Sequence, residues 1–256
     1  MKDLFTLQGR TALVTGGSRG IGRMIAAGFL AQGAKVYISS RKAQACEETA
    51  QELSSLGTCI PLPADVSTVE GCRGLAQAYA QHEPALDILV NNAGAAWGEP
   101  FDTFPEKGWD KVVDLNMKSP FFLTQALYAL LKAAAKSRPA KVIYIASIDG
   151  ISVNPWETYS YSASKAGLIH LTKRMSLRLA QDNIVVSGIA PGAFASEMNK
   201  QARDHGDEVA RRVPAGRIGT GEDMAGAAIY LASRAGDYVV GETIVVDGGV
   251  TLARGS

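Results

Sequence analysis

The sequence predicts an α/β protein with one domain, built on a doubly wound parallel sheet of seven strands with helices on both faces. Short apolar segments alternate with amphipathic segments of helical length along the whole chain, which is the pattern of repeated strand–helix–strand units. Several of these segments are apolar at nearly every residue, as expected of parallel strands buried on both sides. No linker, repeat or low-complexity tract divides the 256 residues, so we expect a single domain over 1–256.

The short apolar segments are predicted to be strands, and the amphipathic segments between them helices. The expected strands are 11–14, 35–38, 58–62, 86–90, 141–145, 184–189 and 243–246. The expected helices, whose apolar residues recur at a 3.6-residue spacing, include 21–32, 43–56, 109–136, 159–182 and 221–232. Because helical segments connect successive strands, the strands should run parallel.

One segment, residues 191–219, follows neither pattern. Its apolar beginning gives way to a charged stretch that includes Arg203, Arg211 and Arg212. Long irregular segments in compact domains are often lids, so we expect a substrate lid within about 191–219. The three arginines either meet the phosphates of a carrier arm or form a solvated helix face.

Charge and composition exclude several classes of protein. Lys and Arg total 26 against 25 Asp and Glu, and a net charge of +1 gives no field to attract nucleic acid or an anionic membrane. The sequence shows neither a membrane-spanning stretch nor a signal peptide, so we expect a cytoplasmic location. Three cysteines without a C-x-x-C pair suit reduced thiols, and three histidines without ligand spacing predict no metal site.

A glycine-rich turn follows the first expected strand and precedes a helix. Gly16, Gly20 and Gly22 let the backbone turn tightly and approach a ligand. The helix after them offers free N–H groups and the positive end of its dipole to a phosphate. The spacing G-x-x-x-G-x-G differs from the G-x-G-x-x-G dinucleotide fingerprint, but we interpret it as a turn that binds a dinucleotide.

Three other interpretations of the turn compete with this one. A P-loop requires Lys followed by Ser or Thr, where this chain has Arg23 and Met24. Residues 16–20 match the G-x-S-x-G of a hydrolase around Ser18, but that motif follows several strands and here only one precedes it. The third is a turn that only packs a strand against a helix, and the motifs described next argue against it.

The end of the second expected strand favours NADP over NAD. Folds that bind NAD place an acid about 20 residues after the glycines to hold the ribose 2′-hydroxyl. No Asp or Glu occurs between residues 4 and 46, whereas Arg41 stands near that position and Arg19 lies inside the glycine turn. A guanidinium group can bind a 2′-phosphate through two hydrogen bonds. The alternative is that both arginines are ordinary solvated cations.

Three residues form a candidate acid–base site. Ser147 closes the fifth expected strand, at the carboxyl end of the sheet where open α/β folds bind ligands. Tyr161 and Lys165 are four residues apart near a helix start, so they share one face of that helix. A cation close to a phenol lowers its pKa from ~10, which a tyrosine needs to act as general acid and base. The same spacing also occurs in ordinary surface pairs.

Together these motifs resemble those of the short-chain dehydrogenase/reductase family, whose members have a Rossmann fold. The resemblance extends from about residue 7 to residue 249. It rests on the glycine turn, the sequence Asn-Asn-Ala-Gly at 91–94, Ser147, Tyr161 with Lys165, and Pro191 with Gly192. Each motif alone is weak, but their order and spacing together are specific.

The resemblance implies a role for each matching position. Tyr161 would give a proton to the substrate carbonyl oxygen as hydride arrives from the nicotinamide, and Ser147 would hydrogen-bond that oxygen. Lys165 would lower the pKa of Tyr161 and bind the nicotinamide ribose, while the backbone carbonyl of Asn116 would hold a water. The residues implied in binding NADP(H) are Gly16, Ser18, Arg19, Gly20, Ile21, Gly22, Arg41, Asp65, Val66, Asn92, Ala93, Gly94, Tyr161, Lys165, Pro191, Gly192 and Ser196. A homotetramer, packed through the two long helices and the C-terminal strand, is also implied.

One detail supports the pattern, and two depart from it or complicate it. In an α-helix the carbonyl of Asn116 would bond the N–H of residue 120, but Pro120 has none, so that carbonyl should be free for a water. Tyr159 lies six residues before Lys165 and therefore on another face. Ser196 stands where the family often has Thr, and it keeps the hydroxyl.

Within the family, residues 93–98 and 194–198 most resemble 3-oxoacyl thioester (β-ketoacyl) reductases, including those of rhamnolipid synthesis. Sugar and polyol dehydrogenases share much of this pattern. Trp97, Trp156, Phe194 and Met198 either line an apolar substrate pocket or serve only as core or interface side chains. A protein that senses a dinucleotide without turnover would tend to lack the tyrosine or the lysine, and both are present. We therefore expect NADPH-dependent reduction of a small-molecule ketone, a free or carrier-bound 3-oxoacyl thioester.

Overall fold

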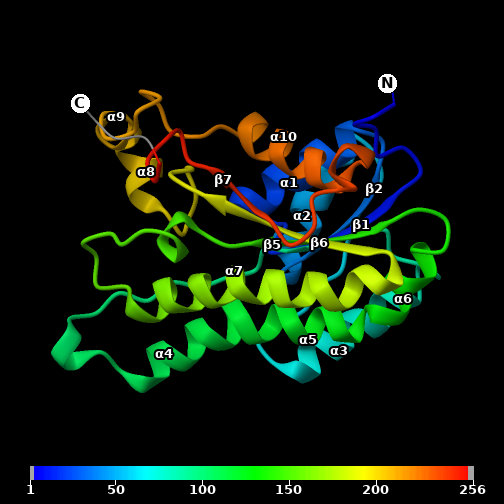
Figure 1. Ribbon diagram of the computed structural model, residues 1–256, viewed down its shortest axis with the longest axis horizontal. Coiled ribbons are helices and arrows are strands. Elements are labelled where there is room, and N and C mark those ends of the chain that lie inside the picture. The colour runs from blue at the N-terminus through cyan, green and yellow to red at the C-terminus, as the bar shows by residue number, and fades with distance from the viewer. Residues whose placement is uncertain (1–2, 253–256) are drawn as a thin grey trace.

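The computed structural model describes residues 3–252, and its seven strands form one parallel sheet (Figure 1). The strands are β1 (Thr11–Thr15), β2 (Lys35–Ser39), β3 (Cys59–Pro61), β4 (Ile88–Asn91), β5 (Ala140–Ile145), β6 (Ile184–Pro191) and β7 (Thr243–Val246). Their order across the sheet is β3-β2-β1-β4-β5-β6-β7. The predicted fold class and all seven predicted strands are confirmed.

The strand order reverses beside β1. Leu13 of β1 lies opposite Tyr37 of β2 on one side and opposite Leu89 of β4 on the other. From β1 the chain adds strands outward through β2 to one edge of the sheet, and from β4 it adds strands outward to the opposite edge. The loops that follow β1 and β4 therefore diverge. Open α/β sheets bind their ligands at the carboxyl ends of the strands at such a point.

Two layers of helices cover the sheet (Figure 1). One layer contains α1 (Gly20–Ala31), α2 (Ala43–Leu53) and α10 (Gly221–Ala232). The other contains α3 (Val69–Ala80), α4 (Glu106–Val113), α5 (Ser119–Ala126), α6 (Tyr128–Ala134) and α7 (Tyr159–Leu179). The side chains of β1 alternate between the layers: Ala12 and Val14 join the α1 side of the core, and Leu13 joins the α7 side.

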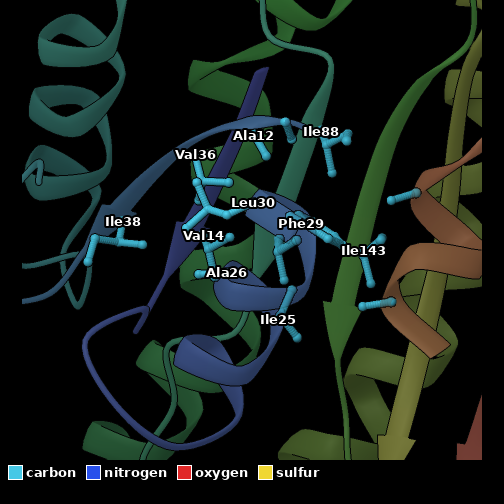
Figure 2. Packing of buried hydrophobic residues seen from close by; sticks show 14 of the residues in the cluster. Ala12, Val14, Ile25, Ala26, Phe29, Leu30, Val36, Ile38, Ile88 and Ile143 are labelled. Atoms are coloured by element: carbon cyan, nitrogen blue, oxygen red, sulfur yellow. The ribbon is translucent and has the colours of Figure 1, made fainter. Parts of the chain in front are cut away.

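The core on the α1 side is shown in Figure 2. Apolar side chains of α1 pack on those of β1 and β2, namely Ile25, Ala26, Phe29 and Leu30 on Ala12, Val14, Val36 and Ile38. A Cβ at Gly28 would lie 2.5 Å from the Cβ of Ala225, so this glycine allows α1 and α10 to approach closely. Burial of this apolar surface is the main force that holds the layer on the sheet.

A buried arginine ties together segments that are distant in the sequence. The guanidinium group of Arg10 donates to the carbonyl oxygen of Ala232 at the end of α10 (3.0 Å) and to that of Pro139 before β5 (2.5 Å). Its Nε lies 3.5 Å from a carboxylate oxygen of Asp87. These contacts join the first and last parts of the fold at the amino ends of the strands, opposite the loops that follow β1 and β4.

The helices differ from expectation in two places. The helix expected over 109–136 is interrupted, because α4 and α5 are joined by a π-helical segment, Asp114–Lys118, and α5 and α6 are separated at Leu127. Helix α3 lies between the third and fourth strands, where the strand–helix–strand pattern places a helix although its bounds were not given, and the expected lid contains two short helices, α8 (Lys200–Asp204) and α9 (Gly206–Ala210). None of the helices within residues 3–252 is long and apolar enough to span a membrane.

Candidate active site

The glycine-rich turn connects β1 to α1 at the carboxyl edge of the sheet. Gly16 and Gly20 have φ values of 65° and 53°, which side chains other than glycine rarely adopt. A Cβ at Gly22 would lie 2.3 Å from the carbonyl oxygen of Gly16. Each of the three predicted glycines therefore has a steric reason to be there.

The first turn of α1 is free to bind an anion. Arg19 precedes the helix in an extended conformation, its side chain does not cap the helix, and no acid lies in the first turn. The unpaired N–H groups and the positive end of the dipole therefore face the glycine turn. Beside them lies a cavity of about 220 Å³, lined by Arg19 and Gly20 on one side and by Ser196 of the lid on the other. This arrangement fits the pyrophosphate of a dinucleotide.

Thr15, at the end of β1, joins this turn to the end of β4. Its hydroxyl donates to the carbonyl oxygen of Val90 (3.3 Å) and accepts from the N–H groups of Asn92 and Ala93 (both 3.0 Å). In return, the side-chain amide of Asn92 donates to the carbonyl oxygens of Thr15 (2.9 Å) and Gly16 (3.2 Å). Thr15 was not among the residues predicted from the sequence, where its only local signal is its position before the first glycine.

Two unpaired arginines lie near the end of β2 and the glycine turn. Arg19 and Arg41 are exposed, and neither makes an ion pair with another described residue. The neighbouring Arg23, by contrast, pairs with Glu52 at 3.0 Å. Ser39, the last residue of β2, has a buried hydroxyl that finds no partner in residues 3–252. Two free guanidinium groups in this region fit a 2′-phosphate.

Ser147, Tyr161 and Lys165 meet beyond the carboxyl end of β5. Ser147 is buried two residues after Ile145, where β5 ends. The Nζ of Lys165 lies 5.6 Å from the centroid of the Tyr161 ring and donates to the carbonyl oxygen of Ile145 at 2.7 Å. The four-residue spacing thus places both side chains on one face of α7. Tyr159 is exposed and donates to Glu157 (3.1 Å), away from this group.

The pKa values at this site differ from the sequence expectation. Burial raises the pKa of Tyr161 to about 12; the Ser147 hydroxyl opposes this shift and the Asp149 carboxylate adds to it. Burial lowers the pKa of Lys165 to about 8. Burial thus outweighs the lowering of the Tyr161 pKa expected from Lys165, whose ammonium group lies over the ring and donates to a backbone carbonyl. Tyr161 is protonated at neutral pH.

Asn116 is buried within the π-helical segment. Its side chain accepts from the N–H of Ala95 (2.8 Å) and donates to the carbonyl oxygen of Ala95 (2.9 Å) and to the hydroxyl of Ser164 (3.1 Å). It thereby ties the loop after β4 to α7. The Asn116 carbonyl was expected to be free because residue 120 is proline, but this holds only for a regular α-helix. Here the segment is π-helical, and the N–H of Ser119 donates to the carbonyl of residue 114, five residues back. Such π-turns are frequent at functional sites.

The lid begins where β6 ends, at Pro191. Gly192 has no space for a side chain, because its Cβ would lie 2.7 Å from the Cβ of Asp247. Ser196 reaches the glycine turn, where a Cβ at Gly20 would lie 3.1 Å from the Cβ of Ser196. The structure therefore brings the predicted lid serine to the predicted phosphate site.

Two of the three lid arginines are paired within the lid. Arg203 pairs with Glu197 and with Asp204, the latter at 2.7 Å. Arg212 pairs with the acid four residues before it at 3.4 Å. Arg211 is exposed and makes no ion pair with any residue in 3–252. This pairing favours the solvated helix face over a site for the phosphates of a carrier arm.

The four apolar candidates for a substrate pocket divide into two pairs. Trp97 packs on α4, where a Cβ at Gly108 would lie 2.9 Å from its ring, and Phe194 is buried. Trp156 and Met198 are 58% and 50% exposed. Trp97 and Phe194 therefore pack within the fold, and Trp156 and Met198 are available to a ligand.

Comparison with known proteins agrees with this geometry. The family model described as "Enoyl-(Acyl carrier protein) reductase" matches residues 16–251. A rhamnolipids biosynthesis 3-oxoacyl-(acyl-carrier-protein) reductase of Pseudomonas aeruginosa is 45% identical over 256 residues, covering 98% of this chain and 100% of that protein. A 2-dehydro-3-deoxy-D-gluconate 5-dehydrogenase of Dickeya dadantii is 37% identical over 260 residues, covering 98% and 99%.

A solved structure has nearly the same fold. The Pseudomonas aeruginosa RhlG/NADP active-site complex superposes with a TM-score of 0.95 at 45% identity, covering 98% of this chain and 100% of that one. The matched region contains the glycine turn, Asn116, Ser147, Tyr161 and Lys165. The chain belongs to the short-chain dehydrogenase/reductase family of oxidoreductases.

Proposed function

We propose that this protein is an NADPH-dependent reductase of 3-oxoacyl thioesters. The observation that carries the proposal is the apolar character of the loop that connects β5 to α7. Ile151, Val153 and Trp156 of this loop are 47%, 98% and 58% exposed, and they lie between Ser147 and Tyr161 in the chain. Exposed apolar side chains at a site suit an acyl chain, because binding the chain removes both surfaces from water. The name of the Pseudomonas aeruginosa relative supports the same substrate class.

The proposed cofactor is NADP(H), held between the glycine turn and the lid. The free N–H groups of α1 would bind the pyrophosphate, and Arg19 and Arg41 would bind the 2′-phosphate. The relative in the solved complex is named with NADP, which supports this assignment. When bound, the nicotinamide supplies the hydride. The remaining proposed contacts are Ser18, Ile21, Asp65, Val66, Asn92, Ala93, Gly94, Pro191, Gly192 and Ser196.

The proton is supplied by the side chains beyond β5. The hydroxyl of Tyr161 donates its proton to the ketone oxygen as the hydride reaches the carbonyl carbon, which yields the secondary alcohol. The hydroxyl of Ser147 donates a hydrogen bond to the same oxygen and stabilises the negative charge that develops there. Lys165 stabilises the phenolate that remains, because a nearby cation favours the charged form. Asn116 acts as a positioning residue by holding α7 against the loop after β4.

A second candidate is the reduction of a keto sugar acid. The 37% identity to the Dickeya dadantii dehydrogenase favours it. A sugar acid carries a carboxylate, which proteins usually bind with Arg or Lys. The loops at 93–105 and 148–158 contain neither residue type, so we rank this candidate below the thioester.

The proposed assembly is a homotetramer packed through α5, α7 and the edge strand β7. A groove of about 390 Å³ between α5 and α7 is lined largely by apolar side chains, among them Met117, Phe121, Phe122 and Leu171. Burying such a surface against a second copy is favourable. At one edge of the sheet β7 has a strand neighbour on one side only, and its unpaired edge suits a second contact.

The proposed location is the cytoplasm. Cys46, Cys59 and Cys72 are free thiols, and two of them are buried. Unpaired cysteines suit a reducing compartment.

The function is tested by NADPH consumption with purified protein. The substrates are a short and a long 3-oxoacyl thioester and a neutral keto-sugar, with NADH as the control cofactor. We expect turnover of the thioesters with NADPH and much slower turnover with NADH. Activity on the keto-sugar alone would overturn the substrate class, and no reduction of any of the three would overturn the activity.

A further inference from the structure

The two loops beside the catalytic tyrosine carry acidic residues and no basic ones. The loop after β4 spans residues 93–105 and the loop before α7 spans 148–158; their charged residues are Glu99, Asp102, Asp149 and Glu157. The loops are joined, because the N–H of Glu99 donates to the carbonyl oxygen of Glu157 (3.2 Å) and the N–H of Phe101 donates to the Glu157 carboxylate (3.2 Å). The two joined loops therefore carry four acidic residues and no basic ones.

Asp149 differs from the other acids of these two loops. Glu157 is exposed, and its carboxylate already accepts from Phe101 and from the hydroxyl of Tyr159. Asp149 is partly buried, and its carboxylate makes no hydrogen bond or ion pair with another residue in 3–252. Its charge is therefore uncompensated and is screened less than that of an exposed acid.

The backbone fixes Asp149 beside the catalytic residues. Its N–H donates to the hydroxyl oxygen of Ser147 at 3.1 Å. The next residue, Gly150, is pressed against α7, where a Cβ would lie 2.6 Å from the carbonyl carbon of Lys165. The groups that face the Tyr161 phenol are thus Ser147, Lys165 and Asp149, and the last raises the pKa of Tyr161.

We propose that Asp149 is a specificity-determining residue, which makes the site reject ketones that carry a carboxylate near the carbonyl group and accept neutral ones. This inference rests on the proposed reductase function. A carboxylate close to a ketone held by Ser147 and Tyr161 must approach the Asp149 charge, and repulsion between like charges is strong in a partly buried site. A thioester or ester presents no charge at that position.

The test is the Asp149→Asn variant with a matched pair of substrates. Ethyl 3-oxooctanoate and the freshly prepared 3-oxooctanoate anion share the acyl chain and the ketone, and they differ in the charge beside the ketone and in the ethyl group of the ester. We expect the ratio of kcat/KM for the acid to that for the ester to rise by at least about tenfold, as the loss of one close like-charge interaction would give. Asp149→Glu retains the charge and should retain the wild-type ratio. Glu222→Gln, which removes an exposed charge on α10 across the sheet from α7, should retain it too.

A second measurement tests the effect of the Asp149 charge on the pKa of Tyr161. Oxidation of ethyl 3-hydroxyoctanoate by NADP⁺ needs the phenolate, so its rate rises with pH below the pKa of Tyr161. Removal of the Asp149 charge lowers that pKa. Asp149→Asn should therefore oxidise the alcohol at least about threefold faster at pH 8 to 9, which corresponds to a decrease of about half a unit in the pKa of Tyr161. A variant that merely disturbed the fold would be slower.

The outcomes separate this inference from the function on which it rests. Wild-type protein that reduces neither substrate would overturn the proposed function and the inference with it. Wild-type turnover of the ester with an unchanged acid-to-ester ratio in Asp149→Asn would overturn the inference alone. So would an Asp149→Glu variant that accepts the acid as well as Asp149→Asn does.

Discussion

Tyr161 is the residue on which the proposed chemistry depends, and its hydroxyl can be removed without removing its ring. Tyr161→Phe should lower kcat/KM on a 3-oxoacyl thioester by at least about 100-fold, because no other phenol takes the place of the proton donor. NADPH binding, followed by fluorescence titration, should stay near wild type. Tyr159→Phe is the matched control, since Tyr159 is exposed and bonds Glu157, and it should keep its activity. Residual turnover above a few per cent in Tyr161→Phe would show that another group donates the proton.

The pH dependence of reduction should come from Lys165 rather than from Tyr161. With a pKa raised to about 12, the phenol stays protonated throughout the working range, so it imposes no loss of rate near neutral pH. With a pKa lowered to about 8, Lys165 is charged below that pH and neutral above it. Because the ammonium group stabilises the phenolate product, kcat/KM for reduction should fall as the pH rises through about 8. A profile from pH 6 to 10 checks this, and a flat profile would show that the charge is not needed.

Arg41 should set the preference for NADPH. Arg41→Ala removes a charged hydrogen bond to the 2′-phosphate, which contributes roughly 1.5–3 kcal/mol, so the Kd for NADPH should rise by more than about tenfold. The Kd for NADH should not change, because NADH lacks this phosphate. Lys42→Ala removes an adjacent exposed cation and is the control. An unchanged ratio of the two dissociation constants would contradict the cofactor assignment.

At the scale of elements, loss of the Thr15 hydroxyl should weaken the connection between β1 and the end of β4. Thr15→Val keeps the shape but leaves two partly buried N–H groups, those of Asn92 and Ala93, without their acceptor. The free energy of unfolding should fall by about 1–3 kcal/mol, measured by urea denaturation. Thr58→Val, at an exposed threonine, should change it by less than about 0.5 kcal/mol. Equal stability of both variants would show that the hydrogen bonds of Thr15 do not contribute to stability.

The elements that the sequence predicted well are those with a strong, uninterrupted pattern. Helix α10 was predicted with its observed ends. The segment 109–136 has helical spacing throughout, but a π-turn and the break at Leu127 depend on packing against α7 and on backbone pairing that spacing does not record. The bounds of helix α3 were not given from the sequence although its buried residues have helical spacing, because Gly71 and Gly74 weaken the signal.

The site could be predicted as far as it is local in sequence. The glycine turn and the Tyr161–Lys165 pair are defined by short spacings, and the structure shows the expected turn and shared helix face. The orientation of Lys165 was not predictable, because its Nζ bonds a carbonyl 20 residues away on another element. The contribution of Thr15 was hidden for the same reason, since its partners on and after β4 are more than 70 residues away.

At the scale of the whole molecule, the apolar groove between α5 and α7 should control assembly. Phe122→Glu replaces an apolar side chain of this groove with a charge, and removing a charge from water against a second copy is costly even where Lys118 and Arg174 of the groove lie near it. The mass in solution, measured by light scattering, should drop from that of a tetramer to that of a smaller species. Leu56→Glu, at an exposed leucine after α2, is the control and should leave the mass unchanged. A tetramer that survives Phe122→Glu would place the contact elsewhere.

The link between Arg10 and the end of α10 has a consequence for how the chain reaches its fold. The donor and acceptor of that bond are separated by 222 residues, and α1 is covered by α10, which ends at Ala232. The α1 layer therefore cannot be completed on the ribosome until nearly the whole chain has been synthesised. Contacts of such long range make folding slow and leave apolar surface uncovered during synthesis. The nascent chain should accordingly need protection by chaperones until α10 emerges, whereas the finished enzyme does not.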